Sequence, residues 1–342
     1  MRAFACPHCS ALVFFENSVC LTCGTEIGFS RAERTVVRAQ GRHRCANRRT
    51  ATCNWFADGP GALCDCCALT RTRPADDDAA GLAAFALTEQ AKRRLLYQLD
   101  DLALPVVGRD AGRGGDPRGG LAFDLLSSTH EPVTTGHASG VVTLDLAEGD
   151  AGYRERMRVQ LAEPYRTLLG HLRHETGHWY WEVLVDRPGR NDDFRALFGD
   201  ERESYADALE RHYSSAPPGG WEDRYVSSYA TAHPWEDWAE TFAHYLHIRD
   251  TSQTAAAFGI SVQGPLDARE DLTSEPHESE KDFDAIAAAW LPLTYALNAV
   301  NRSMGHADLY PFVLAPTVLD KLRFVHELVV ARPAYVPVSP PA

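Results

Sequence analysis

The chain has 342 residues, of which 44% are hydrophobic and 24% are charged, proportions that are ordinary for a globular protein. Its formal net charge of −13 is unevenly spread. Residues 1–75 hold 10 Lys and Arg against 5 Asp and Glu, whereas the remainder holds 24 against 42. The first residues lack a secretion signal, and no stretch approaches the roughly 20 apolar residues of a membrane span. We therefore expect a cytoplasmic protein of two or three domains that does not contact a membrane.

The first four cysteines form two C-x-x-C pairs, separated by ten residues that include a short apolar run. Each pair offers two thiolates, and four thiolates complete a tetrahedral structural zinc site. So small a unit lacks a core, so we expect the metal to supply about 10 kcal/mol of folding free energy. A disulfide module is the alternative, which the missing secretion signal disfavours. The predicted ligands of structural zinc 1 are Cys6, Cys9, Cys20 and Cys23.

Five more cysteines follow with looser spacing, and four of them suffice for a second structural zinc site. The predicted ligands of structural zinc 2 are Cys45, Cys53, Cys64 and Cys67. Cys66 is then spare, although it could replace a neighbouring ligand. The many arginines of this region suggest nucleic-acid binding. Eight thiolates with two Zn²⁺ ions add about −4, however, which lowers the local charge from +5 to about +1 and favours a protein partner over nucleic acid.

One helix and one strand are predicted between the cysteines and the next motif. Residues 82–102 have helical spacing of apolar positions, and residues 108–120 have the Gly-rich composition of a flexible loop. Residues 141–146 have the composition of a β-strand bounded by glycines. This strand either forms the edge of a cleft along which an extended peptide aligns, or lies inside a sheet. The sequence does not distinguish these two placements.

The most informative motif is H-E-x-x-H, within an apolar segment at residues 163–185 that we expect to be a helix. His174 and His178 then lie on one helix face and can bind one Zn²⁺, and Glu175 between them faces a metal-bound water. The apolar surroundings argue against two surface histidines. His171, one turn earlier, is either an outer-shell or substrate-binding group or a core histidine that is satisfied by hydrogen bonds.

Another helix is expected to begin at Pro234, because proline suits the first helical position and acidic residues follow it. A catalytic zinc has three protein ligands and one open position. The candidates for the third ligand are Glu236, Asp237, Glu240 and His244. All but Asp237 share one helix face, and spacing does not choose among them.

The stretch Tyr229-x6-Glu236-x3-Glu240, downstream of H-E-x-x-H, resembles the gluzincin peptidases of the anthrax lethal factor type. The resemblance implies that Glu236 is the third zinc ligand, that Glu240 is an outer-shell carboxylate, and that Tyr229 steadies the oxyanion. A carboxylate in the place of Glu240 can also accept the free N–H of a zinc-bound histidine and fix its tautomer.

From Cys6 to about Phe258 the chain resembles a bacterial family of zinc-binding metallopeptidases with an amino-terminal zinc ribbon. The resemblance rests on Phe15-Glu16-Asn17-Ser18, Cys53-Asn54-Trp55, residues 165–171, His174 to His178, Phe198-Gly199-Asp200, and His233 to His247. Cys66 and the Gly-rich residues 108–120 depart from the family pattern.

We therefore expect an α+β fold, with a mainly helical zincin-like peptidase core and a small sheet, preceded by a zinc-ribbon module. The expected parts are a double zinc-binding region at 1–75, a helix and Gly-rich linker at 76–120, the peptidase domain at 121–332, and a disordered Pro-rich tail at 333–342. Further helices are expected at 200–213, 285–300 and 318–330. The expected cofactors are one catalytic and two structural zinc ions.

The expected activity is hydrolysis of a peptide or protein substrate by a zinc-activated water, with Glu175 as the general base. The alternative is an interaction protein whose ribbons bind a protein or nucleic acid and whose hydrolase core is idle or merely structural. Glu175 argues against that alternative, because an idle site has little need of a carboxylate between two imidazoles. Amide hydrolysis of a small non-peptide substrate is a third possibility.

Overall fold

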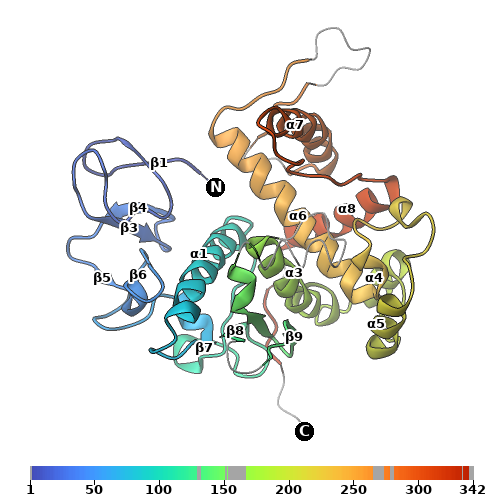
Figure 1. Cartoon of the computed structure of the whole chain (residues 1–342), viewed down its shortest axis with the longest axis horizontal. Helices are drawn as coiled ribbons and strands as arrows, with labels where there is room; N and C mark the ends of the chain where they lie inside the picture. Colours follow the sequence, from blue (N-terminus) through green and yellow to red (C-terminus); the bar gives the residue numbers. More distant parts are fainter. Residues whose placement is uncertain are drawn as a thin grey trace. The chain divides into compact units, whose positions relative to one another are not determined.

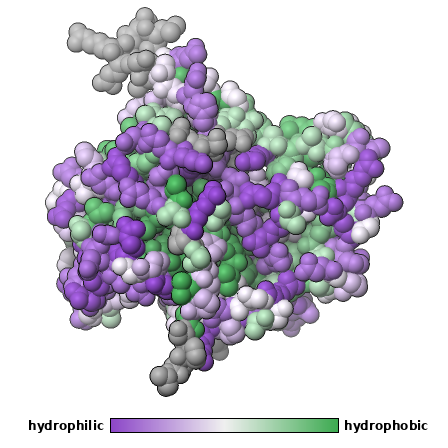
Figure 2. All heavy atoms as spheres, turned by 180° about the vertical axis from the view of Figure 1, so that it is seen from behind, coloured by the Kyte–Doolittle hydropathy of each residue, from purple (hydrophilic) through white to green (hydrophobic). Residues whose placement is uncertain are grey.

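In the computed structural model, the described residues are 2–128, 132–150, 152, 167–264, 273–277, 281–332 and 334–338. The chain divides into two compact units, Met1–Met157 with Tyr335–Ala342, and Arg158–Ala334. Helices occur in both units, and the small sheets lie in the first (Figure 1), which confirms the expected α+β class. On the face shown in Figure 2, hydrophilic side chains cover most of the surface and apolar ones form smaller groups between them.

The cysteine-rich part of the first unit consists of three two-stranded hairpins. They pair β1 (Phe4–Ala5) with β2 (Leu12–Val13), β3 (Ile27–Ser30) with β4 (Thr35–Arg38), and β5 (His43–Arg44) with β6 (Phe56–Ala57). Strands this short bury little surface by themselves. Instead, aromatic side chains within and next to these strands pack together with one from helix α1 (Ala79–Asp101), at centroid distances from 4.8 to 6.4 Å. These residues are Phe4, Phe15, Phe29, Trp55 and Tyr97.

A four-stranded sheet follows in the same unit, with the strand order β7-β8-β10-β9. Its strands are β7 (Thr70–Thr72), β8 (Ala122–Leu126), β9 (Gly136–Ala138) and β10 (Val141–Asp145). The strand predicted at 141–146 is β10, which pairs in parallel with β8 and antiparallel with β9. The backbone of β10 therefore forms hydrogen bonds with a neighbouring strand on each side. The interpretation as a cleft edge is wrong, and the internal placement is correct.

The Gly-rich residues 108–120 are not the flexible loop that their composition predicts. The backbone folds back on itself, with Asp116 N donating to Gly108 O at 2.8 Å and Gly120 N donating to Asp116 O at 2.9 Å. A Cβ on Gly120 would lie 2.2 Å from Gly108 O, so the glycines permit a close backbone approach that other residues would prevent. The tail expectation is likewise wrong for two described residues, because Tyr335 Oη and Val338 N both donate to Asp116 Oδ2 at 2.9 Å.

The second unit is helical. Its helices are α3 (Leu168–Trp181), α4 (Asn191–Phe198), α5 (Tyr205–Ser214), α6 (Pro234–Ala257), α7 (Phe283–Ser303) and α8 (Pro316–Ala331). The helix predicted at 163–185 is confirmed as α3, and residues 163–166 lie outside the described part. Thr167 caps α3 by accepting a hydrogen bond from Gly170 N, and Pro234 occupies the first position of α6 as predicted.

Helix α7 is long and apolar enough to cross a membrane by length and composition alone, which the sequence analysis did not anticipate. Core helices of globular proteins pass the same test. In this structure 39% of its most apolar window is buried, and Ile286, Trp290 and Leu293 belong to the core of the unit.

Candidate catalytic site and metal centres

Two helices of the second unit bring the H-E-x-x-H histidines to a carboxylate. Helix α3 carries His174 and His178, and α6 packs beside it (Figure 1) and carries Glu236. One ligand atom from each of the three residues lies within 4.8 Å of the others. His174 Nε2 lies 3.0 Å from Glu236 Oε2, and His178 Nε2 lies 3.6 Å from Glu236 Oε1. The structure thus brings together the two motif histidines and the carboxylate that the resemblance implied as the third ligand.

The close approach of α3 and α6 depends on the glycine inside the motif. A Cβ on Gly177 would lie 3.2 Å from Ala239 Cα and 3.3 Å from Ala239 O, which is tighter than ordinary contact. Trp238 Nε1 also donates to Gly177 O at 2.8 Å and ties the helices together at this level. Gly177 therefore sets the helix separation at which an α6 carboxylate reaches the α3 imidazoles.

The three residues fit a zinc ion by distance and by chemistry. Zinc bonds of about 2.0–2.1 Å in a tetrahedron separate neighbouring donor atoms by roughly 3.4 Å, and the two distances above lie on either side of that value. Glu236 is 1% exposed, and its Oε2 has no hydrogen-bond partner among the described residues. A buried carboxylate oxygen without a partner is costly, and a cation at this position removes the cost.

Glu240 contacts the Nδ1 side of the His174 imidazole, opposite the Nε2 atom that faces Glu236. Its Oε1 lies 2.6 Å from His174 Nδ1, and its Oε2 accepts a hydrogen bond from Ser227 Oγ at 2.6 Å. A carboxylate on Nδ1 places the proton there and leaves Nε2 free to bind a metal. Glu240 is thus placed to orient His174, and Ser227 is placed to orient Glu240.

The electrostatics of the site favour a positive charge between its helices. Burial acts to lower the pKa of His174, but Glu236 and Glu240 raise it by more, so the net shift is well upward. Burial acts to raise the pKa of the carboxyl groups of Glu236 and Glu240. The nearby histidines lower the pKa of both groups by more than burial raises it. The pKa of Glu236 falls well below its usual value, and that of Glu240 falls to about 2. Both carboxylates are therefore ionised at neutral pH and available to stabilise a cation.

Glu175 is a buried carboxylate on the same helix, with 6% of its surface exposed. Burial acts to raise its pKa, but the hydrogen bond from His171 and the nearby imidazoles outweigh that effect, so the net shift is downward. His171 Nε2 lies 3.5 Å from Glu175 Oε1, which places His171 beside Glu175. Glu175 is thus held ionised and can accept a proton.

Tyr229 lies in a 3₁₀ turn, Tyr229–Thr231, just before α6. Its ring centroid is 5.8 Å from that of His174 and 5.6 Å from that of His212. Burial raises its pKa well above the usual value, as does the negative charge of Glu236, so its hydroxyl keeps its proton. Tyr229 therefore offers an O–H donor beside the imidazole pair.

The other two candidates for the third ligand point elsewhere. Asp237 is fully buried and pairs with Lys321 Nζ at 2.5 Å, which links α6 to α8. His244 lies one turn beyond Glu240, but its Nδ1 is 2.8 Å from Tyr310 Oη. Neither belongs to the cluster with the imidazole pair.

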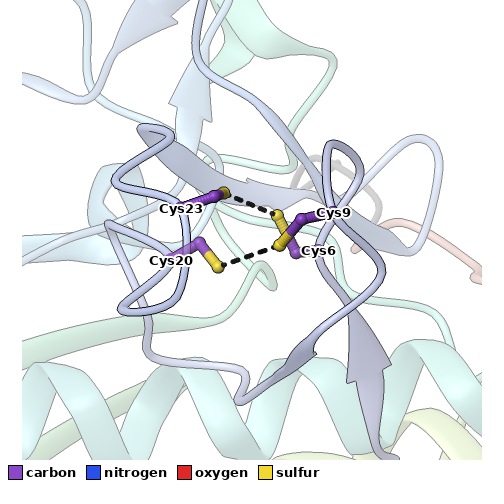
Figure 3. Close-up of side chains that lie close together, drawn as sticks. All are labelled: Cys6, Cys9, Cys20 and Cys23. Atoms are coloured by element: carbon purple, nitrogen blue, oxygen red, sulfur yellow. Dashed lines mark hydrogen bonds between the residues drawn. The ribbon is translucent and has the colours of Figure 1, made fainter.

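In the first unit, the first four cysteines converge as Figure 3 shows. The sulfurs of Cys6 and Cys23 are 3.7 Å apart, as are those of Cys9 and Cys20. Zinc–sulfur bonds of about 2.3 Å in a tetrahedron separate the sulfurs by roughly 3.8 Å, whereas a disulfide requires about 2.05 Å. The spacing fits a tetrathiolate zinc site and excludes disulfides.

The second cysteine cluster contains the four predicted residues Cys45, Cys53, Cys64 and Cys67. The sulfurs of Cys53 and Cys64 are again 3.7 Å apart. Cys66 is fully buried outside the cluster, and burial raises its pKa, so it is not needed as a ligand.

Helix α1 supplies buried charges next to this second cluster. Cys67 Sγ lies 3.5 Å from Glu89 Oε2, and Lys92 Nζ donates to Glu89 Oε1 at 2.5 Å. Both side chains are 0% exposed. A zinc ion with four thiolates would carry about −2, and the Glu89 carboxylate adds negative charge beside it, which the paired ammonium group of Lys92 offsets. The second site is therefore built from the ribbon and α1 together.

Sequence reasoning missed Ser227, which contacts Glu240, and Tyr205, whose Oη donates to Glu236 Oε1 at 2.5 Å. Neither belongs to a motif, and no spacing links them to α3 or α6. Their proximity to the site arises from tertiary packing alone.

The comparisons with known proteins agree with this organisation. The profile of a family described as "Putative zinc-binding metallo-peptidase" matches residues 81–328, and a zinc-ribbon domain profile matches residues 3–78. Three uncharacterized mycobacterial proteins are 52% identical over 335 residues, covering 96% of this chain and 95% of theirs. They are Rv2568c of Mycobacterium tuberculosis strain H37Rv, MT2644 of strain CDC 1551, and Mb2598c of Mycobacterium bovis. No solved structure matches the chain at a significant level. The chain belongs to the family described as putative zinc-binding metallo-peptidases, and a zinc-ribbon domain precedes the peptidase part.

Proposed function

We propose that the protein is a gluzincin-type peptidase that hydrolyses peptide bonds, with His174, His178 and Glu236 as the ligands of its catalytic zinc. The observation that carries the proposal is Glu236 Oε2, a buried oxygen with no hydrogen-bond partner among the described residues, 3.0 Å from His174 Nε2. Zinc at such a site supplies Lewis acidity, which lowers the pKa of water to near 7 and polarises a carbonyl group.

The remaining steps belong to side chains of the chain itself. Glu175, held ionised at the site, accepts the proton of the attacking water and then passes it to the leaving amine. Tyr229 donates its hydroxyl proton in a hydrogen bond to the carbonyl oxygen as negative charge develops there. Glu240 keeps the proton of His174 on Nδ1. The substrate in this proposal is a peptide or protein, as for other members of the family, and the two tetrathiolate sites hold the ribbon region together.

The experiment compares the full chain with Glu175→Gln. The amide cannot accept a proton, so we expect peptide cleavage to fall by about 10²- to 10⁴-fold while the zinc content stays unchanged. Glu327→Gln, an exposed position on α8, serves as the matched control and should cleave like the wild type. The measurements are cleavage of a peptide library, followed by mass spectrometry, and zinc content by elemental analysis.

Three outcomes would contradict the proposal. Loss of zinc together with activity in Glu175→Gln would make Glu175 a structural residue. A zinc-loaded wild type that cleaves no peptide and no small amide would favour the alternative, an interaction protein that binds partners through its zinc ribbons and whose hydrolase core is inactive. Cleavage of small amides alone would favour a non-peptide substrate.

A further inference from the structure

The structure places an unassigned hydroxyl group on the proposed zinc ligand. Tyr205, the first residue of α5, donates from Oη to Glu236 Oε1 at 2.5 Å. The rings of His233 and Trp235 pack against the ring of Tyr205, at centroid distances of 5.2 and 6.1 Å. Trp235 directly precedes Glu236 and His233 lies three residues before it, so the start of α6 positions both the carboxylate and the rings that pack against Tyr205.

The two oxygens of Glu236 therefore have different surroundings. Oε1 accepts the hydrogen bond from Tyr205 and lies 3.6 Å from His178 Nε2, whereas Oε2 has no hydrogen-bond partner among the described residues and lies nearer to an imidazole, 3.0 Å from His174 Nε2. A carboxylate can bind a metal through one oxygen or through both. A hydrogen bond to one oxygen directs the metal to the other.

We propose that Tyr205 is a positioning residue that makes Glu236 a one-oxygen ligand and so keeps a coordination position open for water. The inference rests on the proposed zinc site. A catalytic zinc works with three protein ligand atoms and one open position. If both Glu236 oxygens bound the metal, they would add a fourth protein atom and crowd that position. Tyr205 thus acts through Glu236 and need not touch the substrate.

The chain offers a matched control on the same helix. Tyr213 lies eight residues after Tyr205 on α5, is 64% exposed, and makes no side-chain hydrogen bond in the described part of the chain. The Tyr213→Phe substitution removes a phenol hydroxyl group, as Tyr205→Phe does, but leaves the hydrogen bond to Glu236 in place. Tyr213→Phe should therefore behave like the wild type.

The test compares Tyr205→Phe, Tyr213→Phe and the full wild-type chain. A mild chelator removes the metal from the imidazole–carboxylate site, and one equivalent of Co²⁺ replaces it. The visible spectrum of Co²⁺ reports coordination number, because four-coordinate sites absorb more strongly than five-coordinate ones. We expect the spectrum of Tyr205→Phe to weaken toward that of a five-coordinate site. We also expect kcat to fall by about 10- to 100-fold, as for other residues that orient a metal ligand, with KM little changed.

A Co²⁺ spectrum and kcat of Tyr205→Phe equal to those of the wild type would overturn the inference while leaving the proposed zinc site intact. A wild type that takes up no Co²⁺ outside its cysteine clusters would instead contradict the proposed function itself. Equal thermal unfolding of the two tyrosine variants excludes a general loss of folding as the cause of any difference.

Discussion

At the scale of single residues, Glu236 and Glu240 lie one turn apart on α6 and have different partners. Glu236 lies close to the Nε2 atoms of His174 and His178, whereas Glu240 contacts Nδ1 of His174 and the hydroxyl group of Ser227. We expect Glu236→Ala to release the catalytic zinc, because it removes a ligand and its charge. Glu240→Ala should weaken zinc binding by about 10- to 100-fold.

Competition with a chromophoric chelator measures both zinc affinities. The opposite ranking, with Glu240→Ala releasing the metal and Glu236→Ala only weakening it, would exchange the two roles.

His244 makes the stability of the protein depend on pH. Burial lowers the pKa of its imidazole from 6.5 to about 4. Between these values the unfolded chain binds more protons than the folded chain, so the free energy of unfolding falls as the pH falls from about 6.5 to about 4. The full loss corresponds to about 3 kcal/mol, at about 1.4 kcal/mol per pH unit.

A non-titrating side chain at this position should reduce that dependence. We expect the loss of stability between pH 7.0 and pH 4.5 to be about 2 kcal/mol smaller in His244→Asn than in the wild type, as measured by urea unfolding. His306→Asn, at an exposed position, should show the wild-type dependence. An unchanged pH dependence in His244→Asn would show that His244 is not held neutral by the fold.

The residues that sequence alone could identify are those whose spacing encodes shared geometry. C-x-x-C pairs and H-E-x-x-H place their ligands on one knuckle or one helix face, and the structure brings those side chains together. Ser227 and Tyr205 could not be found this way, because their contacts with α6 cross 13 and 31 residues without a periodic pattern. The catalytic role of Tyr229 remains a prediction from resemblance.

At the scale of elements, the contact between α3 and α6 determines whether the ligands converge. A methyl group on Gly177 would press on the backbone of Ala239, which cannot move aside as a flexible side chain does. We therefore expect Gly177→Ala to separate the helices, to lower the stability by about 1–3 kcal/mol, and to weaken binding of the catalytic zinc.

Thermal unfolding and chelator competition measure these two effects. Gly219→Ala is the matched control, because a Cβ at that glycine meets nothing within 4 Å and should change neither quantity. Wild-type zinc affinity in Gly177→Ala would mean that the helix separation is not set at this contact.

The long helices could be predicted from the sequence because their apolar periodicity extends over many turns. Helices α1, α6, α7 and α8 lie where patterning and capping residues placed them. The flexible loop predicted from composition at residues 108–120 is wrong, because the glycines there permit a close approach of backbone segments. The place of β10 inside its sheet depends on partners distant in sequence, β8 above all, which no local pattern records.

At the scale of the whole molecule, each compact unit holds its own groups of side chains that could bind a metal ion. The first unit holds two clusters of four thiolates, and α1 contributes buried charges to the second of them. The second unit holds the imidazole–carboxylate cluster and the residues that orient it. Residues 76–342 carry a net charge of −18, against +5 in residues 1–75.

The central claim is that a third zinc ion binds in the second unit, which contains no cysteine. Diffraction from crystals of the zinc-loaded protein at the zinc absorption edge locates each ion directly. We expect three anomalous peaks, with the third about 2.0–2.2 Å from Nε2 of His174, Nε2 of His178 and one oxygen of Glu236. Only two peaks, both within the cysteine clusters, in crystals grown with excess zinc would contradict the account.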